Sequence, residues 1–406
     1  KLTNLNMQKN ILIIGAGIAG CSLAHFLANS GWDVTLLESE DNIAQGGSGN
    51  PVAAIYPKFM LNDEAYNDFM LKSFTFTTEW ISQLGLNEVD YRFDGAIEIL
   101  EKAYAQKLEI NLSKKITAKE DFFCLINESI LNKYSIESNS SGFLFYQGGW
   151  VNPIALCRQL INHSNIKIIT HKKIKLIEKS IDEWVLKTED QKTFNSSHVA
   201  ICNASSVNQF DLTQHLHTDA FRGQVNWINS TSFQMPPIVT CDEGYLAPLI
   251  QDKHVFGATY AMNDFNEDLR TSDTKKNIAS IKSIHRNFYN YCEAQESIAG
   301  RVAWRASTKD RKPYVGRVFD NQLLIKKRVR ELAQADQLPW LKNLYIASGF
   351  GSRGFTFAPY CTYVLANLIN DNLSKEDKKT LNYTNPERYR LKKMSLKKVA
   401  SQIFKV

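Results

Sequence analysis

The sequence predicts an α/β fold in which two domains are interleaved along the chain. Short apolar strands compatible with one parallel sheet occur near the start, in the middle and near the end, at residues 11–14, 198–203 and 344–347. Segments with a β-rich pattern fall between them, most clearly from residue 221 onward. Because one parallel sheet is assembled here from distant parts of the chain, the β-rich segments indicate a second domain inserted into the first.

Composition limits the class of protein. The length of 406 residues exceeds one typical domain, and 44% hydrophobic residues suffice for a sizeable core. The seven cysteines are scattered, with no Cys-x-x-Cys pair and no cluster with histidine, which argues against disulfides and a zinc site and favours a reducing cytosol. No apolar run predicts a membrane span. Residues 11–27 resemble a signal peptide, but glycine spacing explains them better. We therefore expect a cytoplasmic protein with no metal and no membrane partner.

The first informative motif is a glycine turn near the N-terminus. Gly15, Gly17 and Gly20 have G-x-G-x-x-G spacing between a strand at 11–14 and a helical pattern. A second strand ends at Glu38, whose carboxylate can accept both hydroxyls of an adenosine ribose. Such glycines allow a tight turn, approach of a pyrophosphate and close helix packing, and the helix N-terminus binds phosphates. The alternative is a purely structural turn. The residues expected to bind a dinucleotide here are Gly15, Gly17, Ile18, Ala19, Gly20 and Glu38.

The elements that follow are predicted from apolar spacing. Aromatic residues at helical spacing predict a helix over 64–84, and alternating apolar residues predict a strand over 91–100. Residues 101–141 are polar and poorly patterned, so no element is assigned to them. The remaining expected elements are a strand at 142–146, a helix at 153–163, a strand at 166–170, an antiparallel meander at 174–178, 184–188 and 192–195, and helices at 274–292 and 359–370.

A second glycine loop lies between the strand at 344–347 and the helix at 359–370. Backbone N–H groups at such a junction can stabilise the negative charge that a flavin acquires on reduction. Glycine loops at both ends of the chain favour FAD over NAD, because FAD spans two sites and no second Rossmann half or catalytic histidine motif is evident. The alternative is a loop with only a turn role. The residues expected to bind the flavin are Gly349, Gly351, Ser352, Arg353, Gly354, Phe355 and Thr356.

Arg305 is the strongest candidate for binding substrate. It lies in a segment predicted to be buried β-structure, where an arginine needs an anionic partner, and its planar guanidinium suits a carboxylate. A structural ion pair with an internal acid is the alternative. Arg353 is the next candidate, for flavin or substrate. Tyr245 and Tyr260 can line a pocket, although aromatic residues in β-segments usually belong to the core. Two arginines are expected to be structural, Arg222 and Arg311.

The predicted elements divide the chain into three parts. A discontinuous FAD-binding domain covers 1–57, 142–214 and 300–374, and a substrate domain covers 58–141 and 215–299. Residues 375–406 form a basic helical tail with ten Lys and Arg against three acidic residues. Since the net charge of the whole chain is +6, the rest is close to neutral. A basic tail suits a polyanion such as RNA, and the alternative is a solvated helix.

Further motifs follow the N-terminal glycines in a fixed order, at residues 46–50, 148–153, 222–225, 244–248, 257–260, 305–310 and 349–359. Together these motifs resemble the D-amino-acid oxidase and glycine oxidase superfamily of FAD enzymes, and the resemblance covers residues 10 to about 370. Within it, the Gly-Ser-Gly-Asn, Arg-Gly-Gln-Val and Gly-Ser-Arg-Gly motifs are most similar to one branch, the C-terminal oxidoreductase domain of the bifunctional tRNA 5-methylaminomethyl-2-thiouridine biosynthesis proteins.

This resemblance implies a reaction at a CH–NH group. Hydride would pass from the carboxymethyl CH2 of 5-carboxymethylaminomethyl-uridine, at the wobble position of tRNA, to flavin N5. Hydrolysis of the imine would leave 5-aminomethyl-uridine and glyoxylate. By the same resemblance Arg305 holds the substrate carboxylate, Tyr245 and Tyr260 match pocket positions, and the 46–50 motif adds three cofactor-binding residues, Ser48, Gly49 and Asn50.

Two features qualify the resemblance. The family's usual N-terminal methyltransferase domain is not within these residues, so it either was cut away or is absent, and it is the expected protein partner beside tRNA. Related sarcosine oxidases tether the flavin through a cysteine near the Arg305 segment. No cysteine lies between residues 293 and 360, so we expect non-covalent FAD.

Two other functions remain open. The first is a free glycine or small amino-acid oxidase, in which the basic tail is incidental. The second is a non-catalytic flavoprotein that keeps FAD for stability. Only the tRNA enzyme should bind its substrate with a steep dependence on salt.

Overall fold

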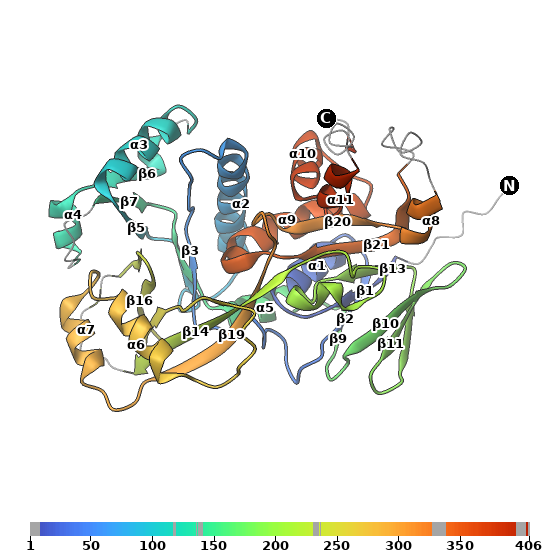
Figure 1. Ribbon diagram of the computed structural model, residues 1–406, viewed down its shortest axis with the longest axis horizontal. Coiled ribbons are helices and arrows are strands. Elements are labelled where there is room, and N and C mark those ends of the chain that lie inside the picture. The colour runs from blue at the N-terminus through green and yellow to red at the C-terminus, as the bar shows by residue number, and fades with distance from the viewer. Residues whose placement is uncertain are drawn as a thin grey trace.

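Two large β-sheets lie at opposite ends of the molecule (Figure 1). The computed structural model describes residues 9–116, 119–134, 136, 141–229, 235, 237–326, 338–394 and 403–404. The chain alternates between the sheets, because strands β1, β2, β9, β13, β20 and β21 form one and strands β5–β7 and β14–β19 form the other. The predicted α/β fold, with a mainly parallel part interleaved with a β-rich part, is confirmed.

The first sheet has six strands in the order β20-β21-β13-β1-β2-β9. Five run parallel, and β20 is antiparallel to β21. The strands at its centre are buried on both faces, as their continuous apolar sequences predict. Their bounds are β1 Asn10–Ile14, β2 Asp33–Leu37, β9 Ile166–Ile169, β13 His198–Ile201, β20 Tyr314–Phe319 and β21 Trp340–Ser348.

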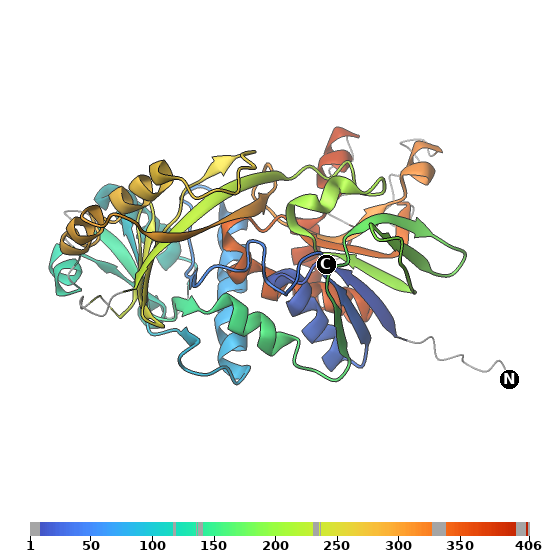
Figure 2. The same cartoon turned by 90° about the horizontal axis from the view of Figure 1, so that it is seen from below.

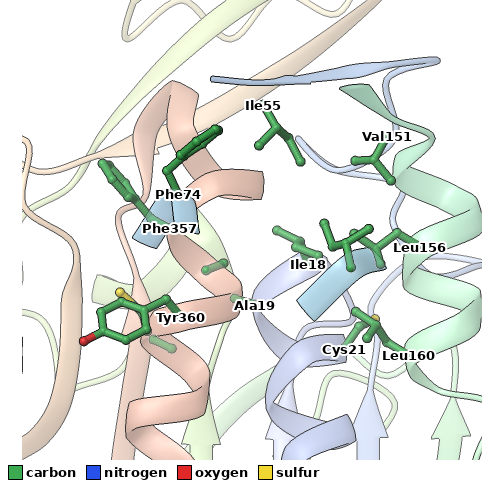
Figure 3. Packing of buried hydrophobic residues seen from close by; sticks show 14 of the residues in the cluster. Ile18, Ala19, Cys21, Ile55, Phe74, Val151, Leu156, Leu160, Phe357 and Tyr360 are labelled. Carbon is green, nitrogen blue, oxygen red and sulfur yellow. The ribbon is translucent and has the colours of Figure 1, made fainter. Parts of the chain in front are cut away.

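Successive residues of β1 bury against different layers. Ile11 and Ile13 belong to the cluster that contains the helices, and Leu12 and Ile14 pack with the three-stranded meander on the other side. Figure 3 shows Ile18 and Cys21 of the first helix packed between neighbouring helices. The elements of these two layers are helices α1 Ile18–Asn29, α5 Pro153–Leu160 and α9 Gly354–Ile369, and meander strands β10 Ile174–Lys179, β11 Trp184–Thr188 and β12 Thr193–Ser196.

The second sheet has nine strands and is mainly antiparallel. Its longest strands, β14 and β19, pair along most of their length. Helices α6 and α7 bury Ile278 and Phe288 against Leu246 and Phe256 of this sheet. The strands are β5 Ala96–Leu100, β6 Phe123–Ile126, β7 Ser141–Phe145, β14 Asp219–Asn229, β15 Val239–Cys241, β16 Tyr245–Ile250, β17 Lys253–Gly257, β18 Ala261–Met262 and β19 Ala299–Ser307. The helices around it are α3 Lys102–Ser113, α4 Glu128–Lys133, α6 Thr271–Ser280 and α7 Arg286–Glu293.

Helix α2 stands between the two sheets, as Figure 2 shows. It spans Glu64–Gln83, begins where the Asp63 carboxylate accepts a hydrogen bond from the Tyr66 N–H at 3.0 Å, and packs against α9. A small sheet lies beside it, formed by β3 Ala53–Ile55, β8 Gly149–Val151 and β4 Tyr91–Arg92. These elements connect the two parts of the molecule.

The predicted helical tail is present in the part of it that the structure describes. It contains α10 (Lys375–Thr384) and α11 (Arg388–Lys393), and a capping box formed by Ser374 and Asp377 begins α10. Leu381 and Leu391 are fully buried. The tail is therefore packed into the protein up to residue 394, while residues 395–402 and 405–406 lie outside the described residues. A further short helix, α8, covers Asn321–Lys326.

Three predicted elements differ from the structure. The last long helix begins at Gly354 and not at residue 359, so Pro359 lies inside α9. Pro359 lacks the N–H that would bond the Phe355 carbonyl, so the helix accommodates it in its second turn with the loss of one backbone hydrogen bond. The predicted helix 274–292 is two helices, α6 and α7, and the predicted strand 91–100 is β4 and β5. The unassigned region 101–141 contains α3, β6 and α4.

Two predicted domain boundaries fall inside strands of the nine-stranded sheet. Residues 142–145 and 300–307, assigned by sequence to the FAD-binding domain, belong to β7 and β19 of the other sheet. Strand β19 pairs with β14 throughout, and its last residue, Ser307, forms a β-bridge with Phe350, which follows β21 of the six-stranded sheet. The division into domains otherwise stays a prediction.

Candidate functional site

A cavity of about 690 Å³ brings the two glycine loops together. It is lined by residues of both sheets and of the loops between them. All predicted site residues line it except two, Gly20 and Gly49. Its volume is in the range of small-molecule and cofactor sites.

The first glycine loop has the geometry that its spacing predicts. Gly15 has φ +98°, and a Cβ there would lie 2.8 Å from the Cys202 carbonyl oxygen. A Cβ on Gly20 would lie 1.9 Å from the Gly15 carbonyl oxygen, so Gly20 serves helix packing and not the cavity wall. Helix α1 begins after Gly17, which has no side chain to cap the helix, and the Ser48 hydroxyl accepts a hydrogen bond from the Ile18 N–H at 3.0 Å. The N–H groups that follow Ile18 in the first turn can bind a phosphate.

Glu38 lies at the end of β2 and is 8% exposed. Its carboxylate accepts a hydrogen bond from the Ala16 N–H at 2.7 Å through Oε2. Oε1 accepts bonds from the Ser39 hydroxyl and the Glu40 N–H, both at 3.1 Å. These bonds fix the carboxylate at the cavity wall, and the remaining lone pairs can still accept ribose hydroxyls.

Sequence reasoning missed Arg301, which holds the loop of residues 45–50. Its guanidinium donates to the Asn50 side chain at 3.0 Å and to the Gly46 carbonyl at 2.8 Å, and it also bonds the Gln45 carbonyl. Ser48 in this loop accepts a hydrogen bond from the Ile18 N–H at 3.0 Å, so the loop is tied to the start of α1. Arg301 lies four residues before Arg305 in the same strand, but its partners are about 255 residues away in sequence.

The second glycine loop leads into a helix that also lacks a side-chain cap. Gly349 and Gly351 have positive φ, +77° and +58°, and a Cβ on Gly349 would lie 2.7 Å from the Thr308 methyl carbon. Helix α9 begins at Gly354 with no side-chain hydrogen bond at its N-cap. The cavity therefore has a helix N-terminus from each end of the chain, and in both helices the N-cap residue makes no side-chain cap bond. Two such helix ends suit a cofactor with two separated polar parts.

Arg353 is engaged within the protein. It donates to the Tyr56 hydroxyl at 3.0 Å and to the Tyr56 carbonyl at 3.4 Å, and its Cζ lies 4.3 Å from the centroid of that ring. Burial opposes its charge, but Tyr56, Tyr66 and Glu98 hold its pKa above the usual value. Arg353 thus fixes the glycine loop to Tyr56, a residue that sequence reasoning did not select.

Arg305 lies in the cavity wall and forms no ion pair with a carboxylate of the described residues. Its guanidinium donates to the Thr259 carbonyl at 3.1 Å, and burial lowers its pKa. The side chain crosses β14 at Gly223, where a Cβ would lie 2.4 Å from Nη1. The alternative of an internal ion pair is therefore not met in the described part of the chain.

Both predicted tyrosines lie near Arg305. Burial raises the pKa of Tyr245, and Arg305 acts against that rise. The Tyr260 ring centroid is 5.7 Å from the Arg305 Cζ, and Tyr260 stacks on Phe221 at 4.2 Å. Tyr260 is 56% exposed, so it marks the mouth of the cavity, while Tyr245 lies deeper.

Other features bear on what the cavity can hold. Cys202 and Cys241 line it, and burial raises the pKa of each thiol to about 12. Such thiols stay protonated at neutral pH, and a protonated thiol is a poor nucleophile.

Among the residues that the structure describes, no three His, Cys, Asp or Glu side chains could hold a metal ion. No described helix is long and apolar enough to cross a membrane.

Comparison with known proteins identifies the family. A family model described as FAD dependent oxidoreductase matches residues 10–368, so the chain belongs to the FAD-dependent oxidoreductase family. The predicted FAD cofactor and oxidoreductase class are thereby confirmed. The two helix N-termini, the fixed Glu38 carboxylate and the glycine cradles of the cavity all fit FAD.

Several relatives of the chain have curated names, and these names agree with one another. The chain is 30% identical over 394 residues to the tRNA 5-methylaminomethyl-2-thiouridine biosynthesis bifunctional protein MnmC of Methylobacillus flagellatus, and 30% identical over 396 residues to that of Legionella pneumophila. These matches cover 96% and 95% of this chain but 60% and 58% of the relatives. The chain thus spans about 60% of the length of the curated relatives it matches.

Solved structures share the fold. Glycine oxidase from Bacillus cereus superposes with a TM-score of 0.72 at 17% identity, covering 91% of this chain and 96% of that one. L-Proline dehydrogenase from P. horikoshii superposes with a TM-score of 0.75 at 17% identity, covering 95% and 99%. At such identities the likeness supports the fold alone.

Proposed function

We propose that this chain oxidises the carboxymethylaminomethyl group of a wobble uridine in tRNA, giving 5-aminomethyl-uridine and glyoxylate. The family supplies FAD-dependent oxidation, and the names of the relatives supply the tRNA pathway. The side group to be oxidised is a secondary amine whose CH2 carries a carboxylate. It is thus a glycine substituted at nitrogen.

The observation that carries the proposal is the state of Arg305. Its guanidinium is partly buried, lines the cavity and has no ion-pair partner among the described carboxylates. A cation that has lost part of its hydration without gaining a counterion is destabilising unless a ligand brings one. The carboxylate of the substrate is that ligand, because a planar guanidinium binds it through two parallel hydrogen bonds.

The other side chains have supporting roles in the proposal. The loops around Gly17 and Gly351 and the Glu38 carboxylate hold FAD, which supplies the acceptor for the hydride. Tyr245 and Tyr260 lie near Arg305 and line the space for the substrate. Arg353 positions the second loop through Tyr56 and does not touch substrate. The amine enters as the free base. FAD binding is non-covalent, in keeping with the high pKa of the cavity thiols.

The proposal extends to partners and location. The relatives are called bifunctional, and about two fifths of their length lies outside the match. We assign a methyltransferase domain as the partner of this chain. A tRNA substrate implies a cytoplasmic protein.

One experiment separates this function from its two rivals. The yellow protein is mixed anaerobically with tRNA carrying 5-carboxymethylaminomethyl-uridine, with glycine and with sarcosine, while the flavin absorbance is followed. Bleaching by the tRNA alone is the expected result. Bleaching by glycine or sarcosine alone would make the protein a small-amine oxidase, since Arg305 can also bind a free amino acid. No bleaching by any of them would leave a non-catalytic flavoprotein.

A further inference from the structure

The loop of residues 308–313 continues directly from the strand that carries Arg305. It brings two cations, Lys309 and Arg311, to the protein surface. Neither forms an ion pair with a carboxylate of the described residues. Arg311 was expected to be structural, like Arg222. Arg222 is indeed fully buried and bonded to Asp273, whereas Arg311 is exposed and has no such partner in the described part of the chain.

This loop is held rigidly from the tail. Arg388 of α11 donates to both carboxylate oxygens of Asp310, at 2.8 and 2.6 Å, and to the Lys312 carbonyl at 2.7 Å. The Tyr389 hydroxyl accepts a bond from the Asp310 N–H at 2.9 Å. Thr308 closes the loop by donating to the same Lys312 carbonyl at 2.7 Å. A bidentate arginine–carboxylate pair gives the loop a defined geometry.

The loop that carries Arg311 packs against the cavity wall. A Cβ on Gly349, which lines the cavity, would lie 2.7 Å from the Thr308 methyl carbon and 3.9 Å from the Pro313 Cα. In agreement with this placement, the charge of Arg311 opposes the rise in the pKa of Tyr260 that burial causes. Tyr260 lines the cavity and is 56% exposed. In addition, Arg311 has φ +61°, a conformation that arginine rarely adopts. Backbone held in a sparsely populated conformation by surrounding bonds is typical of functional sites.

The tail contributes to this arrangement indirectly. Several of its cations are already engaged within the protein. Arg388 binds Asp310, Arg390 binds the Asn321 side chain at 2.6 Å, and Lys379 binds Glu376 at 2.6 Å. The described tail therefore orients the loop more than it offers a free basic surface.

We propose that the loop of residues 308–313 binds the RNA phosphates next to the modified nucleotide, through Lys309 and Arg311. This inference rests on the proposed function, since a base that reaches the cavity stays attached to its flanking phosphates at the mouth. Two exposed cations on a rigid loop match two adjacent phosphates. The loop after β18, which follows Tyr260 in the chain, is unsuitable for phosphates because it exposes Glu267 and Asp268.

The test compares a polymeric and a small substrate in the holoenzyme. The variant Lys309→Gln/Arg311→Gln should raise KM for modified tRNA about tenfold at low salt, and reduce the slope of log KM against log salt by about 1.4 for two lost phosphate contacts. Its kcat and KM for the free nucleoside 5-carboxymethylaminomethyl-uridine should equal those of the wild type. Glutamine has no more difficulty than arginine at φ +61°, so flavin content should not change.

Two further variants are the controls. Lys309→Arg/Arg311→Lys keeps both charges and should behave as wild type. Lys167→Gln/Lys179→Gln removes two exposed lysines on β9 and β10 that do not line the cavity, and it should leave the salt slope unchanged. The inference would be overturned if the control raised the KM for modified tRNA as much as the loop variant does, or if the loop variant left that KM unaltered. In either case, turnover of the modified tRNA by the wild type would still support the proposed function. Failure of the tRNA to bleach the wild-type flavin would overturn both.

Discussion

Arg305 is the residue on which substrate recognition depends. No carboxylate of the described residues forms an ion pair with it. Its guanidinium lies over Gly223, a position that a side chain on that residue would block. A protein that keeps a partly buried cation in a cavity wall keeps it at a cost in stability, which a bound carboxylate offsets. The residue therefore favours substrates that carry an anion over amines that do not.

We predict that Arg305→Ala retains FAD and loses turnover. The expected fall in kcat/KM is on the order of 10²-fold or more, because the carboxylate loses both its charge partner and its orientation. Flavin absorbance per protein and steady-state kinetics measure the two effects. Arg305→Lys, which keeps the charge without the planar fork, should recover only part of the activity. Loss of FAD from Arg305→Ala would instead assign Arg305 a structural role.

The two arginines of β19 show which site residues a sequence pattern can predict and which it cannot. Arg305 could be selected from the sequence because a buried arginine in a β-segment needs an anion, whatever its neighbours are. Arg301 could not, because its partners are backbone carbonyls and an amide of the loop at residues 45–50. Nothing in the local sequence indicates contacts between segments so far apart. Tyr56, which holds Arg353, was missed for the same reason.

At the scale of elements, glycines of the strand–helix–strand unit at the N-terminus have two different roles, one at the cavity and one in helix packing. A Cβ on Gly17 would have the Ser48 hydroxyl oxygen as its nearest neighbour, at 3.2 Å, whereas a Cβ on Gly20 would lie 1.9 Å from a backbone oxygen. The first position faces the cavity, and the second joins α1 to the turn. The two glycines should therefore fail in different ways when substituted.

We predict that Gly17→Ala folds but binds FAD more weakly, by roughly 10- to 100-fold, since a methyl group blocks the approach of the phosphates. Gly20→Ala should lower the melting temperature of the apoprotein, because the backbone of the turn must move. Titration with FAD and thermal unfolding of both apoproteins measure these effects. Equal melting temperatures for the two variants would contradict the distinction.

Regular elements were predictable where apolar spacing was strong. Helix α2 and the meander β10–β12 were placed within a few residues by their periodicity. The start of α9 was misplaced because Pro359 resembles a helix start, although the helix accommodates it in its second turn. Elements α3 and α4 were missed, because their burial depends on strands from other parts of the chain and leaves only a few apolar positions.

At the scale of the whole molecule, the tail is part of the packed structure. Leu381 and Leu391 are fully buried, and α11 holds the loop beside the cavity. We predict that deleting residues 375–406 lowers the free energy of unfolding by several kcal/mol, at about 2–5 kcal/mol for each buried leucine. Urea unfolding measures it, with Lys392→Gln/Lys393→Gln as a control that removes exposed charge alone. Unchanged stability with weaker tRNA binding would make the tail a separate RNA-binding arm.

Stability should also depend on pH through His198 at the start of β13. Burial, with a smaller effect of Lys342, lowers the pKa of His198 to about 4, below the ordinary histidine value of 6.5. The unfolded chain then binds more protons than the folded one between pH 6.5 and 4. The contribution of neutral His198 to the free energy of unfolding is therefore full above pH 6.5 and is lost as the pH falls toward 4. Comparing urea midpoints at pH 7 and pH 5 tests this, since His198→Phe should reduce the difference.

The alternation of the chain between the sheets has a consequence for biosynthesis. Within the six-stranded sheet strand β1 is synthesised before its neighbour β13, and β21 completes the parallel strands only at Ser348. About 330 residues lie between the two glycine loops, and the ribosome needs roughly 15–65 seconds to add them at the usual rates of elongation. A nascent chain that has not yet reached the second loop therefore lacks half of the flavin site, so complete FAD binding has to wait for that loop. Until then the apolar strands up to β13 lack their partner β21, and such unpaired strands are prone to aggregate.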